Sequence, residues 1–168
     1  MDKKQIRKIL NDWDRTSIDV DVDGVEGVKE LFVGQKIVKV EKENIRLDFC
    51  DFDVGVMTLS NGVKVIAKPN EGCGGCDSGW YFLENINTID HVITDVEITY
   101  KDKKESDETY GEEKKFVPAE RTDWDYYYDT TYFLKIYSEG VFVGNALEVV
   151  GSDGNGYYGT AFELIVVQ

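Results

Sequence analysis

Two cysteines separated by two glycines, Cys73 and Cys76 in "NEGCGGCDSGW", are the residues of this chain best suited to chemistry. A spacing of two residues lets both thiolates reach one metal ion, and the glycines permit the tight turn that this requires. A thioredoxin-like redox pair needs a helix directly after its first cysteine, whereas "CDSGWYF" has the pattern of a strand. A structural zinc site is therefore preferred over a redox couple, a disulfide or two unliganded loop cysteines.

Zinc takes four ligands, and a second closely spaced cysteine pair is absent from the sequence. His91, the single histidine, follows Cys76 by fifteen residues and is the predicted third ligand. Cys50, Asp77, Asp153 and water compete for the fourth position, although Cys50 is more typical of a small buried apolar residue. If the site keeps a water, the alternative function is a zinc-dependent hydrolase of a small signalling molecule or nucleic acid.

The acidic segment "DVDVDGVEGVKE", residues 19–30, matches the twelve-residue calcium loop of an EF-hand, with Glu30 at the last position. Its eighth position, normally apolar, is Glu26, and Gly34 leaves barely a turn for the exit helix. Valines alternate with the aspartates, as in an edge strand. We therefore expect a solvated acidic edge here, with calcium binding as the open alternative.

The run "TDWDYYYDTTYF", residues 122–133, mixes aromatic and acidic side chains. Tyrosine and tryptophan anchor many protein interfaces, and Asp123, Asp125 and Asp129 add negative charge. The run predicts a long strand with one face in the core and some tyrosines exposed. The glycine-rich loop "GSDGNGYYGTAF", residues 151–162, lacks the Lys-Ser/Thr of a phosphate loop and is expected to lie beside Cys73 and Cys76.

The elements that position these residues are mostly strands, so the predicted fold class is α+β: mostly antiparallel β-sheet with an N-terminal helix and a metal-bound loop. The chain is predicted to be a single domain, residues 1–168, with a helix over residues 2–13 and a β-rich body over residues 31–168. The helix places Ile6, Ile9, Leu10 and Trp13 on one face.

Turn signals divide the β-rich body. We expect a tight turn at "KEN" (residues 42–44), a type I′ hairpin turn at Asn61-Gly62 and an exposed loop over residues 101–115. The remaining predicted strands are "WYFLENI", "HVITDVEITY", "DWDYYYDTTYFLKIY", "GVFVGNALEVVG" and "YYGTAFELIVV".

The net charge of the chain limits the kinds of molecule that it could bind. The 168 residues contain 19 Lys and Arg against 33 Asp and Glu, which gives a formal net charge of −14. Such a chain repels nucleic acid and anionic membranes and favours a basic protein partner. We expect an intracellular protein, because the sequence shows neither a signal peptide nor a membrane span and has only three cysteines. One histidine, without a nucleophile or nucleotide motif, also argues against an enzyme.

Three stretches together resemble a family of small acidic domains encoded by phages and prophages: "NEGCGGCDSGWYF", "IDHVITDVEI" and "GSDGNGYYGTAFELIVV". The resemblance covers about residues 31–168, and the family includes a zinc-containing anti-CRISPR inhibitor of type II systems. It implies that Cys73 and Cys76 bind zinc. It also implies a stoichiometric inhibitor in the host bacterial cytoplasm that binds the RNA-guided Cas nuclease and blocks target DNA loading. The basic channel of such a nuclease would attract a chain of charge −14.

Overall fold

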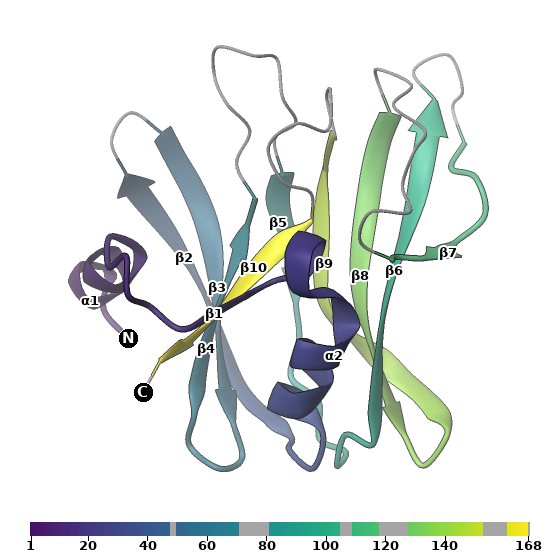
Figure 1. Cartoon of the computed structure of the whole chain (residues 1–168), viewed down its shortest axis with the longest axis horizontal. Helices are drawn as coiled ribbons and strands as arrows, with labels where there is room; N and C mark the ends of the chain where they lie inside the picture. The colour runs from purple at the N-terminus through teal and green to yellow at the C-terminus, as the bar shows by residue number, and fades with distance from the viewer. Residues whose placement is uncertain (48–49, 71–80, 105–108, 118–127, 153–160, 168) are drawn as a thin grey trace.

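The computed structural model describes residues 1–47, 50–70, 81–104, 109–117, 128–152 and 161–167. Over these residues, two five-stranded sheets face each other as a sandwich, and two helices lie against it (Figure 1). All strand pairs in the described residues are antiparallel. The fold is therefore α+β and mostly antiparallel sheet, as predicted.

The strand orders are β1-β10-β4-β3-β2 in sheet A and β5-β9-β8-β6-β7 in sheet B. Sheet A consists of β1 (Ser17–Asp19), β10 (Phe162–Val167), β4 (Lys64–Pro69), β3 (Cys50–Leu59) and β2 (Ile37–Leu47). Sheet B consists of β5 (Tyr81–Ile86), β9 (Val141–Ser152), β8 (Tyr128–Ser138), β6 (Asp95–Lys104) and β7 (Lys114–Lys115). The helices are α1 (Lys3–Leu10) and α2 (Val20–Phe32).

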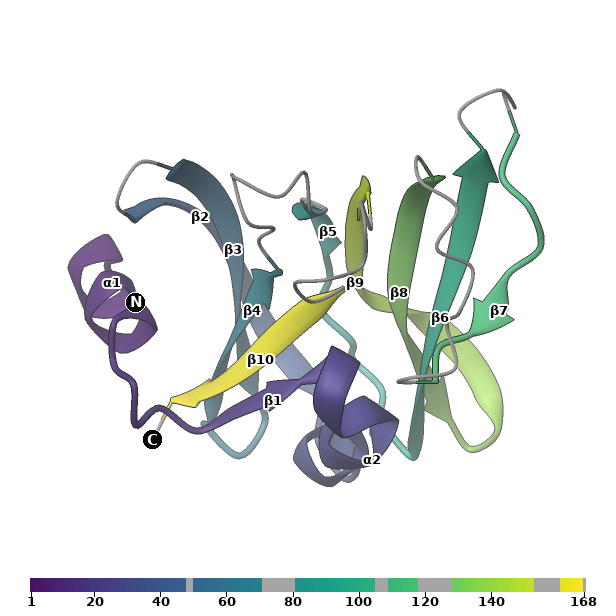
Figure 2. The ribbon, with the colours of Figure 1, turned by 45° about the horizontal axis from the view of Figure 1, so that its top comes forward.

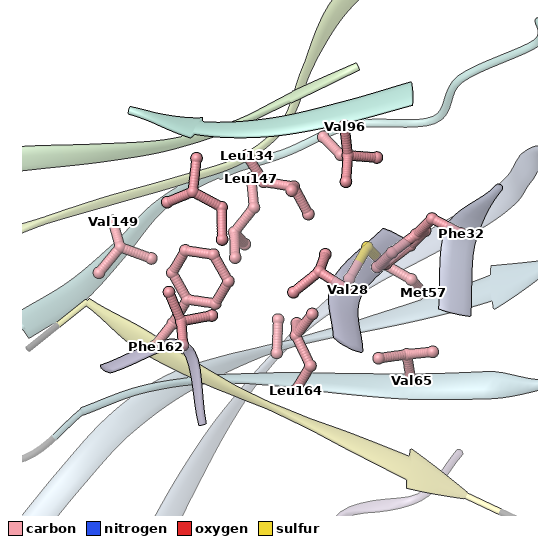
Figure 3. Close-up of a cluster of buried hydrophobic side chains, with 14 of the residues drawn as sticks. Val28, Phe32, Met57, Val65, Val96, Leu134, Leu147, Val149, Phe162 and Leu164 are labelled. Carbon is pink, nitrogen blue, oxygen red and sulfur yellow. The ribbon is translucent and has the colours of Figure 1, made fainter. Parts of the chain in front are cut away.

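The main core fills the space between the two sheets. Figure 3 shows Leu134 and Leu147 of sheet B facing Phe162 and Leu164 of sheet A, with Val28 of α2 beside them. Alternation along β8 produces this face, since its buried side chains are two residues apart: Thr130, Tyr132, Leu134 and Ile136. Over residues 129–137 one face of the strand is therefore in the core, as the sequence predicts, while residues 122–127 of the predicted strand lie outside the described residues.

Helix α1 covers part of the outer face of sheet A. Asp2 and Gln5 form a capping box at its first turn, and Ile6 and Leu10 are buried against that face. The helix ends at Leu10 rather than at residue 13. Trp13 is 94% exposed, so its predicted place on the apolar face was wrong.

Hydrogen bonds from Arg15 fix the residues that follow α1. Its guanidinium donates hydrogen bonds to the Leu10 carbonyl oxygen at 3.0 Å and to the Asp12 carbonyl oxygen at 3.3 Å. The same group pairs with both carboxylate oxygens of Glu163 on β10. The segment between α1 and β1 is therefore fixed to sheet A.

The acidic segment 19–30 is not the predicted edge strand. β1 ends at Asp19 and α2 follows at once, with a break at Gly24, where φ is 66° and ψ is −155°. The alternation of the valines favours a strand, but a helix forms because it buries Val28 and Phe32 between the sheets. Gly34, with φ of 84°, follows the helix as the predicted C-terminal cap.

Three turn predictions need correction. β2 runs without interruption through residues 42–44, since Lys42 and Asn44 lie opposite residues of β3. In the β3–β4 hairpin only Gly62 has positive φ, and its N–H donates to the Leu59 carbonyl oxygen. The turn is therefore type I followed by a left-handed glycine rather than type I′. Residues 101–104, predicted as loop, extend β6 and pair with β8.

Candidate functional site

One end of the sandwich, here called the loop end, gathers the strand ends that flank the predicted functional segments. The register places the following residues there: Leu47 opposite Cys50, Pro69 opposite Phe162, Tyr81 opposite Gly151, Ser152 opposite Asp129, and Lys104 opposite Tyr128. Figures 1 and 2 show these strand ends together in two views. Connections on a rigid sandwich are a common place for binding residues.

The segments that continue from these strand ends are strongly acidic. They are residues 48–49, 71–80, 105–108, 118–127 and 153–160, all outside the described residues. Their sequences contain ten acidic residues and one basic residue, Arg121, a net charge of −9 out of −14. The acidic residues are Asp48, Glu71, Asp77, Glu105, Asp107, Glu108, Glu120, Asp123, Asp125 and Asp153. These five segments of the sequence therefore contain most of the net negative charge of the chain.

Of the predicted metal ligands, the described residues include only Cys50 and His91. Cys73 and Cys76 lie outside the described residues, as do Asp77 and Asp153. Their segment leaves and re-enters the fold at the loop end, where the Tyr81 N–H donates to the Asn70 carbonyl oxygen at 3.3 Å. Cys50, the first residue of β3, lies at this same end.

His91 lies at the opposite end, in the connection from β5 to β6. Its neighbour Asp90 pairs with Lys36 at 3.3 Å, and Ile89 bridges to Ile37 at the start of β2. The six residues of β5 alone span about 17 Å between these positions. The described structure therefore does not bring His91 to the strand ends next to Cys73 and Cys76. Nor do the described residues contain a group of three His, Cys, Asp or Glu side chains placed to hold a metal ion.

A groove of about 430 Å³ lies between α2 and the β6 edge of sheet B. Its apolar lining comes from α2, β6 and the residues after β7: Val25, Val96, Ile98, Phe116 and Val117. Two ion pairs border it, Lys29–Asp95 at 3.1 Å and Lys115–Glu97 at 3.2 Å. Sequence reasoning missed this groove, because the residues become neighbours only through the register of β6 and the helical fold of residues 20–32.

Two ionisable groups of this groove have a raised pKa. The hydrogen bond to Asp95 raises the pKa of Lys29. Burial, and then the hydrogen bond that the Tyr137 hydroxyl donates to Glu97 at 2.9 Å, raise the pKa of Tyr137. Both side chains therefore keep their protons at neutral pH and can donate hydrogen bonds there.

Comparison with known proteins gives one match. No curated protein and no solved structure matches this chain. None of the helices within the described residues is both long and apolar enough to cross a membrane. Residues 30–164, from the end of α2 to β10, match DUF7448, a domain of unknown function. The chain therefore belongs to the DUF7448 family.

Proposed function

We propose that this protein is a phage anti-CRISPR inhibitor whose loop end binds a type II RNA-guided Cas nuclease and blocks target DNA loading. The observation that carries the proposal is the distribution of charge along the sequence: five segments outside the described residues, each joined to a strand end at the loop end, contain −9 of the net charge of −14. The nuclease holds its guide–target heteroduplex in a positively charged channel. A chain with a net charge of −14 is complementary in charge to such a channel.

Residue types in these segments also favour a protein partner. They include Trp80, Trp124, Tyr126 and Tyr127, and tryptophan and tyrosine contribute much of the binding energy at protein interfaces. Nucleic acid itself would be repelled by the same carboxylates. The function proposed for the loop end therefore needs binding and no catalysis.

A structural zinc ion at Cys73 and Cys76 is part of the proposal, with His91 as the predicted third ligand. Two thiolates and an imidazole are donors that zinc prefers, and the ion would hold segment 71–80. Since His91 lies at the other end of the sandwich, its role is tested separately. We expect one zinc per chain by elemental analysis and none after Cys73→Ser with Cys76→Ser. Zinc retained in His91→Ala would assign the third position to another donor.

The function is tested by titration of the protein against a panel of guide-loaded type II Cas nucleases. We expect cleavage of target DNA to fall in proportion to the inhibitor:nuclease ratio and inhibition to weaken as salt rises. If the protein, in molar excess, inhibits no nuclease of the panel, the proposed target is wrong. Substoichiometric inactivation that is independent of salt would instead favour the zinc-dependent hydrolase.

A matched pair of triple variants separates location from net charge. Glu105→Gln, Asp107→Asn and Glu108→Gln neutralise three carboxylates in the segment that follows β6, while Asp14→Asn, Glu30→Gln and Glu84→Gln neutralise three exposed side chains elsewhere. Both variants change the net charge from −14 to −11. We expect the first to weaken binding about tenfold and the second to leave it within about twofold. Equal losses would show that only net charge matters.

A further inference from the structure

The end of the sandwich opposite the loop end gathers exposed hydrophobic side chains among polar residues. This hairpin end consists of residues 33–38, 60–63, 87–94 and 138–142, all of them described. Half of the ten large hydrophobic side chains that are exposed in the described part of the chain lie here: Val33 (44% exposed), Val38 (54%), Val92 (48%), Val141 (63%) and Phe142 (48%). Exposed apolar groups gathered in one region mark an interaction site, whereas single ones do not.

Backbone contacts join these segments into one surface. The Gly34 N–H donates to the Ile93 carbonyl oxygen at 2.8 Å, and the Ser60 N–H donates to the Lys36 carbonyl oxygen at 3.0 Å. The Ser138 hydroxyl donates to the Val92 carbonyl oxygen at 2.8 Å. The apolar side chains are therefore presented by fixed segments, which lowers the entropy lost on binding.

The hairpin end is nearly free of net charge. It carries Lys36, Asp90 and Glu139 besides His91, a formal charge of −1 with the histidine neutral. Lys36 and Asp90 already pair with each other at 3.3 Å. The five segments outside the described residues, by contrast, have a net charge of −9.

We propose that the hairpin end is the interface of a homodimer. A second copy of the chain carries the same charge of −14, so the two molecules repel each other least where charge is lowest. A neutral apolar surface is also self-complementary under two-fold symmetry, whereas an acidic surface is not. The second copy is therefore the occupant that fits both the apolar character and the charge of this end.

The dimensions of the sandwich support the same arrangement. β8 has 11 residues and β9 has 12, so each sheet B is about 35 Å long. In an end-to-end dimer the two loop ends would lie about 70 Å apart, which is several Debye lengths at physiological salt. Their carboxylates would then add little repulsion. The dimer presents two loop ends outward, whatever partner these ends bind.

The test is sedimentation equilibrium of the full chain, whose monomer mass is 19.1 kDa. We expect a dimer at micromolar concentration. We also expect the dimer to be at least as stable at about 500 mM salt as at about 50 mM, because salt screens the repulsion. A monomer at about 100 µM protein across this range of salt would overturn the proposal.

Three variants locate the interface. Val141→Asp and, independently, Val92→Asp should each raise the dimer dissociation constant at least about tenfold, because each buries a carboxylate in the apolar contact. Phe82→Asp, at a side chain that is 60% exposed on β5, is the matched control and should leave the constant unchanged. Melting curves verify that the variants fold. Dimerisation lost in Phe82→Asp but kept in both valine variants would place the interface elsewhere and overturn the proposal.

Discussion

The loop end and the hairpin end close the same pair of sheets with opposite chemistry. Five connecting segments at the loop end carry ten acidic residues and one arginine. Four connecting segments at the hairpin end carry one lysine and two acidic residues, together with five exposed hydrophobic side chains. The strands fix the distance between the loop end and the hairpin end. The residues at each end can therefore differ in type without changing the sheets.

Ion pairs balance part of the negative charge within the described fold. Several described carboxylates have a specific cationic partner, such as Glu163 with Arg15, Glu113 with Lys135 and Asp95 with Lys29. The excess of negative charge is concentrated in the segments beyond the strand ends.

The largest expected effect tests whether the two ends share one core. Phe162→Ala lies at the loop end of β10 and Leu59→Ala at the hairpin end of β3, and both side chains are buried. We expect each change to lower the free energy of unfolding by about 2–5 kcal/mol, in a single calorimetric transition. Two separate transitions, with each variant moving only one of them, would show that the ends fold independently.

A smaller effect is expected at the ion pair that holds the N-terminal segment. Arg15→Ala breaks a two-pronged pair with Glu163 in which the side chains are 24% and 11% exposed. We expect the free energy of unfolding to fall by about 2 kcal/mol, measured by urea denaturation.

The matched control for Arg15 is Lys39→Ala, whose pair with Glu41 at 2.9 Å is much more exposed. A loss below about 0.5 kcal/mol is expected there, because water screens the pair. Equal losses in the two variants would contradict the view that partly buried pairs, rather than surface charge, stabilise the sandwich.

The smallest effect concerns pH and the outer face of sheet B. Burial alone would raise the pKa of Glu113, but hydrogen bonds from Lys135 at 2.7 Å and Thr99 at 2.5 Å hold it below its usual value. A lowered carboxyl pKa stabilises the fold at neutral pH, and that contribution is lost as pH falls through the folded-state value. Glu113→Gln should therefore cost about 1 kcal/mol or less at pH 7.

The melting temperatures of the wild type and of Glu113→Gln should converge as the solution is acidified below pH 4.5, the usual value for glutamate. For Lys135 the pH dependence is opposite: its contribution to stability is lost as pH rises rather than as pH falls. Burial alone would lower its pKa, but Glu113 raises it above 10.5, so this stabilisation persists until pH exceeds that value. A difference between the two proteins that is unchanged down to pH 3 would contradict this assignment.

Much of the fold follows from local patterns in the sequence. The alternation along residues 128–137 correctly separates the buried and outer faces of β8. Asn61-Gly62 correctly marks a hairpin, and Gly34 correctly marks the end of a helix. Each of these signals depends on a few neighbouring residues, so it needs no knowledge of tertiary contacts.

The failures have tertiary causes. Lys42 reads as part of a turn, yet in β2 it pairs with Asp53 of β3 at 3.4 Å and donates to the Leu83 carbonyl oxygen at 2.9 Å. Residues 20–30 read as an edge strand, yet Val28 gains more by burial between the sheets. Strand register and inter-sheet packing decide both cases.

Hydrogen–deuterium exchange of the protein, alone and with a guide-loaded Cas nuclease that it inhibits, tests the central claim most directly. The account predicts new protection in peptides that contain residues 71–80, 105–108, 118–127 and 153–160, and unchanged exchange at residues 33–38, 87–94 and 138–142. Protection confined to the hairpin end, with the loop end unchanged, would contradict it.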